Sequence, residues 1–468
     1  MATTNNLPLE IWEEIVSFLP VSTLSSVCLV SKAFHIPGTR LLYRYIDLNT
    51  VHQTVGCLKT LEKSTLAARS ARHLWMNYKV ELYPEGSVVM QGFFRLISRS
   101  LKRLLNLRTL EIRVVHREFP HLSEYFDYLF DGCNYPHLTM LLLYMPITRN
   151  LVSFLNRHQS TLKTLFLVPL TYYNSEQVAG KNWLFPKLTW FHGADTVTPN
   201  FLSSCSLPAI QRFEVTCSLE TPGTAIQDLI KSIKKTCGDR RLTQLNFNRS
   251  GWNVELIEEI AAQSLSSMIL SVHCIWFDDL PEEDMILGQE RLDLVADSLS
   301  RLSSLRSLYW TVETKFGEHP PPSLTLDEEL KVVLRFGNVC PSLVRCQIPH
   351  GLVWTRCIKN VWMPNDDISK GFTVVRWFFD QLHSRQYPAL DDLLESLTVY
   401  SSLYSFIKEV VDGFRDAGNK LGSDAAEDKA YCKSRTLELM AVSMVLRFWY
   451  SSGFKKNPAY CKFSKLYS

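Results

Sequence analysis

Leu7-Pro8-Leu9-Glu10-Ile11-Trp12 opens the stretch around which this chain is organised, and Cys28-Leu29-Val30-Ser31-Lys32-Ala33-Phe34 closes it. Between these segments, the apolar residues Ile11, Ile15 and Phe18 recur at helical intervals. That spacing places their side chains on one face of a helix. The sequence therefore predicts that the chain begins with amphipathic helices.

Prolines divide this opening stretch into short helices. Pro8 suits the first turn of the first helix, where its missing N–H would have no partner in any case. Pro20 ends that helix, and Pro37-Gly38 ends the helix that follows. A third short helix is expected from Arg40 to Tyr45. The prediction is thus a three-helix segment over residues 1–45.

The opening stretch resembles the F-box, whose pattern begins Leu-Pro-x-Glu-hydrophobic. This sequence carries the pattern at residues 7–11, followed by Phe18-Leu19-Pro20 and Leu29-Val30-Ser31-Lys32. Phe34 stands where the family often has Trp, so an aromatic ring is retained. The resemblance implies docking onto a Skp-type adaptor, which bridges to a cullin–RING ubiquitin ligase. The alternative is an ordinary helical hairpin that covers one end of a larger domain.

Docking would also explain how so small a segment covers its apolar residues. Three short helices cannot bury all of them internally, and full burial of one Leu, Ile, Phe or Val side chain contributes about 1.5–3 kcal/mol. The resemblance implies seven residues that face the adaptor or are essential to the face that does. They are Leu7, Pro8, Ile11, Ile15, Leu24, Val27 and Val30.

Beyond residue 45, a short strand pattern, Leu-x-x-Leu-x-apolar, recurs along the chain. A clear copy is Leu107-Arg108-Thr109-Leu110-Glu111-Ile112. Two strands are predicted before it, at Tyr43 to Leu48 and at Ala71 to Val80. Further copies, some of them loose, begin at Leu138, Leu162, Leu188, Ile210, Leu242, Ser267, Leu305 and Leu343.

Helix-like segments lie between these strands. They are expected at residues 50–62, 149–157, 223–237, 254–262, 290–302 and 326–336. Strands that alternate with helices at intervals of roughly 22 to 38 residues are typical of a solenoid, in which each unit buries its apolar face against its neighbours. The pattern resembles leucine-rich repeats, although the Asn or Cys that usually follows the strand is mostly missing. A non-repeat α/β fold in which the pattern arises by chance is the alternative.

The predicted fold class is α/β, in three parts. Residues 1–45 form an F-box-like helical domain of three helices. Residues 46–370 form an irregular leucine-rich-repeat-like solenoid of strand and helix units. Residues 371–468 are mostly helical and form a C-terminal cap, which a solenoid needs on its last open face, or its final repeats.

Composition narrows the classes of function. The chain has 50 Lys and Arg against 47 Asp and Glu, a formal net charge of +3, which argues against a dedicated nucleic-acid binder. Its 12 cysteines are scattered without close pairs, as expected of free thiols in a reducing compartment. We read no signal peptide and no apolar run long enough to span a bilayer. We expect a cytoplasmic and/or nuclear protein with no membrane partner.

No catalytic or cofactor-binding motif stands out. The sequence lacks a phosphate-binding loop, a dinucleotide fingerprint, a nucleophile elbow and a His-Glu-x-x-His zinc motif. His273 and Cys274 are adjacent, so on a strand they point to opposite faces. We therefore expect no cofactor, no metal and no enzyme activity; an enzyme without recognisable signatures is a third interpretation.

A protein-binding surface has more support in the sequence. In a leucine-rich repeat the leucines point inward, and the residues between them line the opposite face of the sheet. Leu142, Tyr144, Phe166 and Val168 would be apolar side chains exposed together on adjacent strands, which is typical of an interface. With Tyr309, they are the predicted substrate-binding residues. The alternative is that a C-terminal helix or loop covers them.

Together these features predict the substrate-recognition subunit of a Skp–cullin–F-box ubiquitin ligase. The F-box would bind the Skp-type adaptor, the repeat region would hold an unknown protein substrate, and other subunits would supply catalysis. The alternative from another class is an adaptor-binding scaffold that acts outside any ligase.

Overall fold

The structure is a computed structural model of the chain, and it describes residues 8–79, 88–115, 126–168, 182–217, 223–238, 240, 242–276, 288–314, 324–358, 361–364 and 377. The chain forms two compact units. The first comprises Met1–Ser250 with Leu265–Ser267, and the second comprises Gly251–Ser264 with Met268–Ser468. Each unit contains parallel strands and the helices that connect them.

The first unit begins with three helices. They are α1 (Leu9–Ser17), α2 (Val21–Val30) and α3 (Lys32–Leu42). α1 starts directly after Pro8 and α2 directly after Pro20. Both prolines therefore mark helix boundaries, in agreement with the sequence prediction.

The third helix departs from the prediction. It begins at Lys32 and continues through Pro37 and Gly38, where the sequence predicted a helix end. Ser31 accounts for the early start, because its Oγ accepts a 3.2 Å hydrogen bond from the Ala33 N–H and so caps the helix. Pro37 removes only one backbone donor, and the helix passes through it while packed against α2.

Gly38 allows α3 to approach α2 closely. A Cβ atom at Gly38 would lie 2.5 Å from the Sγ of Cys28, which is closer than side chains tolerate. Gly38 is buried, together with Pro37 and Thr39. Close packing between two helices therefore overrides a local signal for a helix end.

Beyond these helices, the first unit consists of parallel strands that pair in chain order. The strands are β1 (Tyr45–Leu48), β2 (His73–Lys79), β3 (Thr109–Val115), β4 (Met140–Tyr144), β5 (Thr164–Leu167), β7 (Trp190–Ala194), β9 (Arg212–Thr216) and β10 (Leu242–Ser250), with β6 (Trp183–Leu184) and β8 (Cys205–Ser206) as a separate parallel pair. Leu110, Leu141 and Leu165 occupy equivalent positions on adjacent strands and are fully buried. Such rows of leucine form the core of this unit.

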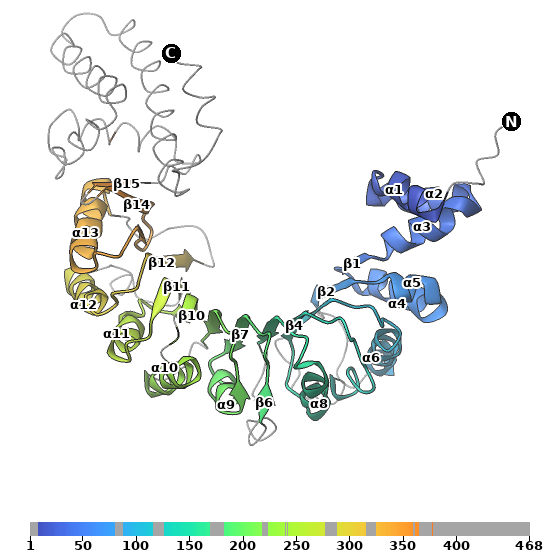
Figure 1. Ribbon diagram of the computed structural model, residues 1–468, viewed down its shortest axis with the longest axis horizontal. Helices are drawn as coiled ribbons and strands as arrows, with labels where there is room; N and C mark the ends of the chain where they lie inside the picture. Colours follow the sequence, from blue (N-terminus) through green and yellow to red (C-terminus); the bar gives the residue numbers. More distant parts are fainter. Residues whose placement is uncertain are drawn as a thin grey trace, which may run out of the picture. The chain divides into compact units, whose positions relative to one another are not determined.

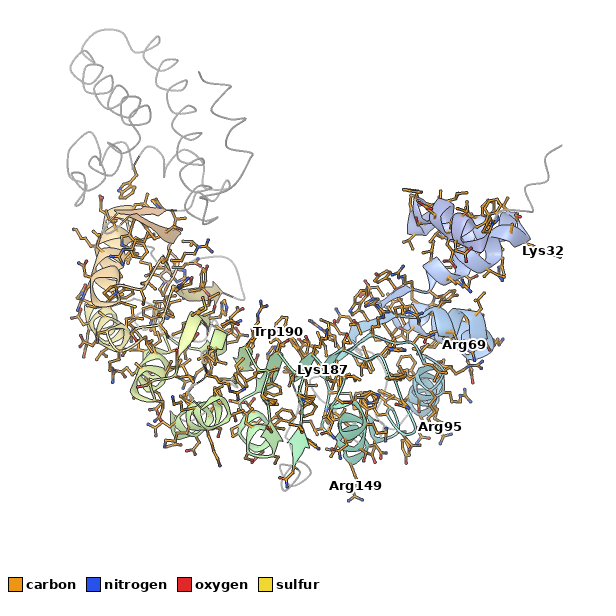
Figure 2. The ribbon with its side chains drawn as sticks, viewed as in Figure 1. Lys32, Arg69, Arg95, Arg149, Lys187 and Trp190 are labelled. Atoms are coloured by element: carbon orange, nitrogen blue, oxygen red, sulfur yellow. The ribbon has the colours of Figure 1, made fainter. Side chains whose placement is uncertain are left out.

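Helices connect the strands and cover one face of the sheet in the first unit (Figure 1). They are α4 (Val51–Lys63), α5 (Thr65–Ser70), α6 (Val88–Leu101), α8 (Arg149–His158), α9 (Thr198–Ser203) and α10 (Gly223–Cys237). Parallel strands need such crossovers because the chain has to return to the same end of the sheet before each new strand begins. Figure 2 shows Trp190 on the helix-free side of the strands, whereas Arg149 on α8 points away on the helical side.

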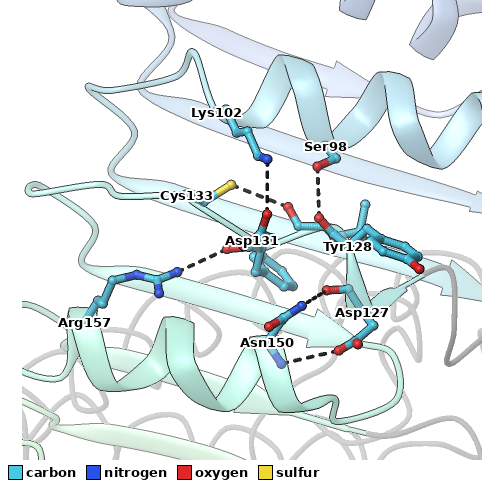
Figure 3. Close-up of polar contacts among 10 residues, drawn as sticks. Ser98, Lys102, Asp127, Tyr128, Asp131, Cys133, Asn150 and Arg157 are labelled. Carbon is cyan, nitrogen blue, oxygen red and sulfur yellow. Dashed lines mark hydrogen bonds and ion pairs between the residues drawn. The ribbon is translucent and has the colours of Figure 1, made fainter.

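Residues 126–135 lie between β3 and β4 in the chain and form hydrogen bonds to both α6 and α8 (Figure 3). On α6, Ser98 Oγ donates a 2.9 Å hydrogen bond to the carbonyl of Tyr128. On α8, Asn150 Nδ2 donates a 2.6 Å hydrogen bond to the carbonyl of Asp127. These side chains satisfy carbonyl groups that this segment does not pair by itself.

The second unit alternates helices and strands and ends in antiparallel strands. Its elements are α11 (Val254–Ala262), β11 (Ser267–Trp276), α12 (Gln289–Leu299), β12 (Ser307–Thr314), α13 (Leu326–Val339), β13 (Arg345–Gln347), β14 (Val353–Ile358) and β15 (Val361–Pro364). β11, β12 and β13 pair in parallel, whereas β14 pairs antiparallel with β13 and β15. Glu329 on α13 is buried, and it accepts hydrogen bonds from Leu352 N at 3.0 Å and Trp354 Nε1 at 2.8 Å. This carboxylate therefore fixes the start of β14 against α13.

The molecule is a mixed α/β protein with helices at its N-terminus, as predicted. Each Leu-x-x-Leu-x-apolar copy from Leu107 to Leu343 overlaps an observed strand, and the predicted helices 223–237 and 254–262 coincide with α10 and α11. The leucine-rich-repeat-like solenoid and the domain boundaries after residues 45 and 370 stay predictions. The predicted C-terminal cap, residues 371–468, lies outside the described residues apart from Trp377.

Replacing Gly38 with Ala should destabilise the packing of α3 on α2. Overpacking of this kind costs about 1–3 kcal/mol, measured as a loss of unfolding free energy in urea. The double variant Cys28→Ala/Gly38→Ala should regain most of that loss, because the clashing sulfur is gone and Ala favours a helix over Gly by about 1 kcal/mol.

Gly56→Ala on α4 is the matched control for this measurement. A Cβ atom at Gly56 would meet nothing within 4 Å, so this variant should lose no stability. An equal loss in Gly38→Ala and in the double variant would contradict the packing explanation.

Candidate functional site

Exposed apolar side chains gather on the three N-terminal helices. Of the fourteen large apolar side chains that are exposed in the described residues, eight lie between residues 11 and 36. Leu29 is 88% exposed, and Val30 is 79% exposed. The eight are Ile11, Ile15, Phe18, Leu19, Val21, Leu29, Val30 and Ile36. So many exposed apolar side chains in one small segment are typical of a protein–protein interface.

The sequence of α2 explains why this helix contributes much of that surface. α2 carries no charged residue, yet Leu24 is its only buried one. A surface helix normally places charged or polar residues on its solvent side. In α2 the solvent side instead includes Leu29 and Val30, so its sequence suits contact with another protein.

Contacts among the helices hold this apolar surface in place. The rings of Trp12 on α1 and Phe34 on α3 pack edge to face, with centroids 4.8 Å apart. Arg40 on α3 forms an ion pair with Glu13 on α1. Because both contacts join α1 to α3, the exposed side of α1 around Ile15 has a defined orientation.

Residues 5–36 match the family model of the F-box domain. This stretch is an F-box domain. F-box domains generally bind Skp-type adaptors, so the match indicates an adaptor-binding subunit and gives the apolar surface a partner of known kind. No curated protein matches the chain.

Most of the predicted adaptor-binding residues lie at the surface of the F-box. Ile11 and Ile15 on α1 are 40% and 44% exposed, and Val30 is more exposed still. Pro8 is exposed and Val27 is half-buried. These residues are therefore available to a partner, although their role in binding stays a prediction.

Two predicted residues differ from the others, and five exposed apolar residues were not predicted. Leu24 is 3% exposed, so it packs inside the F-box and supports the surface instead of forming it. Leu7 lies outside the described residues. The residues missed as adaptor-binding candidates are Phe18, Leu19, Val21, Leu29 and Ile36. Phe18 and Val21 flank the turn at Pro20, and turns between helices leave neighbouring side chains uncovered.

The helix-free face of the first unit's sheet is a second candidate surface. Leu142 on β4 and Phe166 on β5 are register partners, so the structure brings these two predicted substrate residues together. Their predicted exposure is wrong, since they are only 9% and 8% exposed. Tyr144 and Val168 are half-buried.

Side chains from neighbouring strands account for this burial. The rings of Trp190 and His192 on β7 each pack against Phe166, with centroids 4.8 Å away. The Arg113 guanidinium lies 4.4 Å from the centre of the Tyr144 ring. A mixed aromatic and charged surface therefore replaces the continuous apolar patch that the sequence predicted. The alternative prediction is that a C-terminal helix or loop covers these side chains. It concerns residues that lie outside those the structure describes.

His192 lies at the centre of a polar cluster on this face. Its Nε2 is 2.9 Å from Thr216 Oγ1, and its Nδ1 is 3.7 Å from a carboxylate oxygen of Glu214. Burial, and to a lesser extent the Arg113 guanidinium, lowers the pKa of His192 from 6.5 to about 4. Burial raises the pKa of Glu214 above its ordinary value. His192 is therefore neutral near pH 7, and its contact with Glu214 is not an ion pair there.

Tyr309, the fifth predicted substrate residue, belongs to the second unit. It lies half-buried on β12, between its register partners Ser271 on β11 and Gln347 on β13. The polar neighbours on both sides give this position no apolar patch of its own. Its role in substrate binding stays a prediction.

The described residues offer no metal site. No group of three His, Cys, Asp or Glu side chains among them could hold a metal ion. On β11, Cys274 is buried, and His273 Nδ1 lies 2.6 Å from Thr311 Oγ1. Among all the residues that the structure describes, no helix is both long enough and apolar enough to cross a membrane.

The lowered pKa of His192 predicts a loss of stability in acid. The unfolded chain protonates this imidazole near pH 6.5, whereas the folded protein resists protonation down to about pH 4. The stabilising contribution of neutral His192 is therefore complete above pH 6.5 and is lost as the pH falls toward 4. Between pH 7 and pH 4, the wild type should lose about 3 kcal/mol more unfolding free energy than His192→Gln.

The measurement is urea unfolding at both pH values. The exposed His137 provides the control, because His137→Gln should lose as much stability in acid as the wild type. If His192→Gln and the wild type lose equal stability, the imidazole is not held neutral by the fold.

Proposed function

We propose that this protein is the substrate-recognition subunit of a Skp–cullin–F-box type ubiquitin ligase. The observation that carries the proposal is the apolar surface of the F-box, where Phe18, Leu29 and Val30 are largely exposed. Through a Skp-type adaptor the chain would join a cullin–RING ligase. Other subunits would then carry out catalysis, and the chain itself would not be an enzyme.

The size of this surface suits a stable complex. Full burial of Phe18, Leu29 and Val30, which are 80%, 88% and 79% exposed, would contribute roughly 4–7 kcal/mol. That is the same order as the free energy of a micromolar complex, about 8 kcal/mol. Because association also costs translational and side-chain freedom, several of the eight residues have to be buried together.

For the rest of the chain, we propose an irregular leucine-rich-repeat-like solenoid over residues 46–370. The recurrent Leu-x-x-Leu-x-apolar strands, their parallel pairing in chain order and the helices between them support it. In such a solenoid each strand-and-helix repeat has an apolar face that only the neighbouring repeats cover. Residues 371–468 would form a mostly helical cap or the final repeats.

The helix-free face of the first unit's sheet is the proposed substrate-binding surface. Tyr144 and Val168 are partly exposed there, and Leu142 and Phe166 would support them from below. Aromatic side chains bordered by charged groups are typical of protein interfaces. The chain would act in the cytoplasm and/or nucleus, and its substrate would be a protein.

Placing charges on the apolar surface of the F-box should weaken adaptor binding. In the double variant Ile15→Asp/Val30→Asp, two carboxylates would have to be buried without a partner at the interface. We expect a Skp-type adaptor to bind the wild type and to bind this variant at least about tenfold more weakly, since tenfold corresponds to only about 1.4 kcal/mol. Titration calorimetry with purified adaptor measures the difference.

Leu105→Asp is the matched control for the F-box variant. Leu105 is 46% exposed, close to the 44% of Ile15, but it lies in a turn outside the F-box. This variant should bind the adaptor as the wild type does. Absence of binding by the wild type, or equal loss in the control, would overturn the adaptor proposal.

A reconstituted ubiquitylation reaction separates a ligase receptor from a scaffold. Proteins captured by the wild-type chain should gain ubiquitin when the adaptor, cullin–RING subunits and ubiquitin-charging enzymes are present. The Ile15→Asp/Val30→Asp variant should still capture these proteins but should transfer no ubiquitin, because it is not tethered to the ligase. Capture without transfer by the wild type would favour a scaffold acting outside the ligase.

A further inference from the structure

Three arginines form a row at the start of the first three strands. Arg44, Arg72 and Arg108 each stand directly before a strand, at β1, β2 and β3. The carbonyl of Arg44 accepts a 3.1 Å hydrogen bond from Arg72 N, and the carbonyl of Arg72 accepts a 2.7 Å hydrogen bond from Arg108 N. The three residues are therefore adjacent, at the spacing of neighbouring strands, about 4.8 Å. We call this row the arginine ridge.

Within the part of the chain that the structure describes, no carboxylate balances the positive charge of the arginine ridge. None of the three guanidiniums forms an ion pair with any described residue, whereas the nearby Arg99 is paired with Glu62 at 3.1 Å. Arg44 and Arg108 are exposed. Arg72 is half-buried, and its guanidinium donates a 3.0 Å hydrogen bond to a backbone carbonyl, that of Arg69, which carries no net charge.

The guanidiniums of the ridge act against positive charge on Arg72 itself and on the neighbouring His73. Burial first, and then the guanidiniums of Arg108 and Arg44, lowers the pKa of Arg72. The same ridge, after burial, lowers the pKa of His73. Asp47, the exposed carboxylate of β1, is in register with Trp75 instead of with the arginines. An anionic partner would therefore relieve a repulsion that the fold leaves in place.

Stacked rings border the arginine ridge. Tyr45 lies nearly parallel to His73, with centroids 4.5 Å apart, and His73 lies 5.8 Å from Trp75. The Arg44 guanidinium is 5.6 Å from the centre of the Tyr45 ring. Each of these rings therefore has a neighbouring ring or the Arg44 guanidinium beside it. The formal net charge of the chain is only +3, which argues against a dedicated nucleic-acid binder, so the ridge favours a protein ligand.

We propose that the arginine ridge binds an acidic segment of a protein, through carboxylates that pair with Arg44, Arg72 and Arg108. The proposal rests on the function proposed above, since it names a feature of the substrate that the receptor would hold. The ridge spans two strand spacings, about 10 Å. Successive side chains of an extended peptide alternate between two faces at about 3.3 Å per residue, so a run of about five Asp or Glu turns three carboxylates toward the ridge. Guanidinium and carboxylate groups form paired hydrogen bonds of the strong, charge-assisted kind.

The test uses the full chain, both alone and mixed with a Skp-type adaptor. The probe is a fluorescent peptide with a run of glutamates between Gly-Ser segments, compared with the same peptide carrying glutamines. The wild type should bind the glutamate peptide, and binding should weaken as salt rises because exposed charges are screened. Arg44→Gln/Arg108→Gln should bind it at least about tenfold more weakly, as expected for the loss of two charge-assisted contacts.

Arg95→Gln/Arg149→Gln is the matched control. It removes the same charge from two exposed arginines that Figure 2 labels on the helical side of the first unit. This control should bind the glutamate peptide as the wild type does. Equal binding of the glutamine peptide, or an equal loss in the control, would overturn the proposal, and so would a single-stranded RNA or a phosphoserine peptide that binds more tightly than the glutamate peptide.

Adaptor binding, measured on the same samples, distinguishes the two proposals. Both arginine double variants should retain the adaptor, because neither touches the F-box. Loss of peptide binding with the adaptor complex intact supports the arginine ridge. If the wild type binds the peptide but no adaptor, the ridge stands and the ligase function fails.

Discussion

Backbone hydrogen bonding between parallel strands is the constraint on which this structure depends. In the first unit, the residue before each strand accepts hydrogen bonds from the start of the next, as Arg44 does from Arg72 and Arg72 from Arg108. Strands that run in the same direction need a crossover on one face, and helices supply it. One face of the sheet is therefore covered by the chain itself. The opposite face is left to side chains, and equivalent positions on neighbouring strands become continuous rows across it.

The F-box, in contrast to the sheet, cannot cover its own apolar side chains. Its helices are too short and too few to cover their own apolar residues, and α2 lacks charged residues on its solvent side. Packing of α3 on α2 at Gly38 and of Trp12 on Phe34 uses the inner side chains. The outer ones, such as Leu29, have no cover within the described chain. Burial of these apolar side chains therefore requires a partner protein, whereas the strands of the first unit bury their apolar side chains against one another.

Features that depend on nearby residues could be predicted from the sequence, and features that depend on distant residues could not. Strand positions follow from leucine spacing within six residues, so copies such as Leu107 to Ile112 fall on observed strands. The end predicted at Pro37-Gly38 failed because packing against Cys28, ten residues away, decided it. The exposure of Phe166 failed for the same reason, since Trp190 and His192 on another strand cover it. The spacing of apolar residues predicts where a helix or strand lies, whereas contacts between elements determine which of its side chains are exposed.

The arginine ridge shows how far this distinction reaches into function. Its three residues are separated by 28 and 36 positions in the sequence, and the net charge of +3 gives no hint of a local excess. One sequence signal does exist, because an arginine directly precedes each of the three successive strands β1, β2 and β3. That signal acquires meaning only when the backbone ladder is known to place these positions side by side. In a parallel sheet of this kind, residues at equivalent positions of successive strands should therefore be compared with one another. Charged residues that are far apart in the sequence can lie side by side on neighbouring strands.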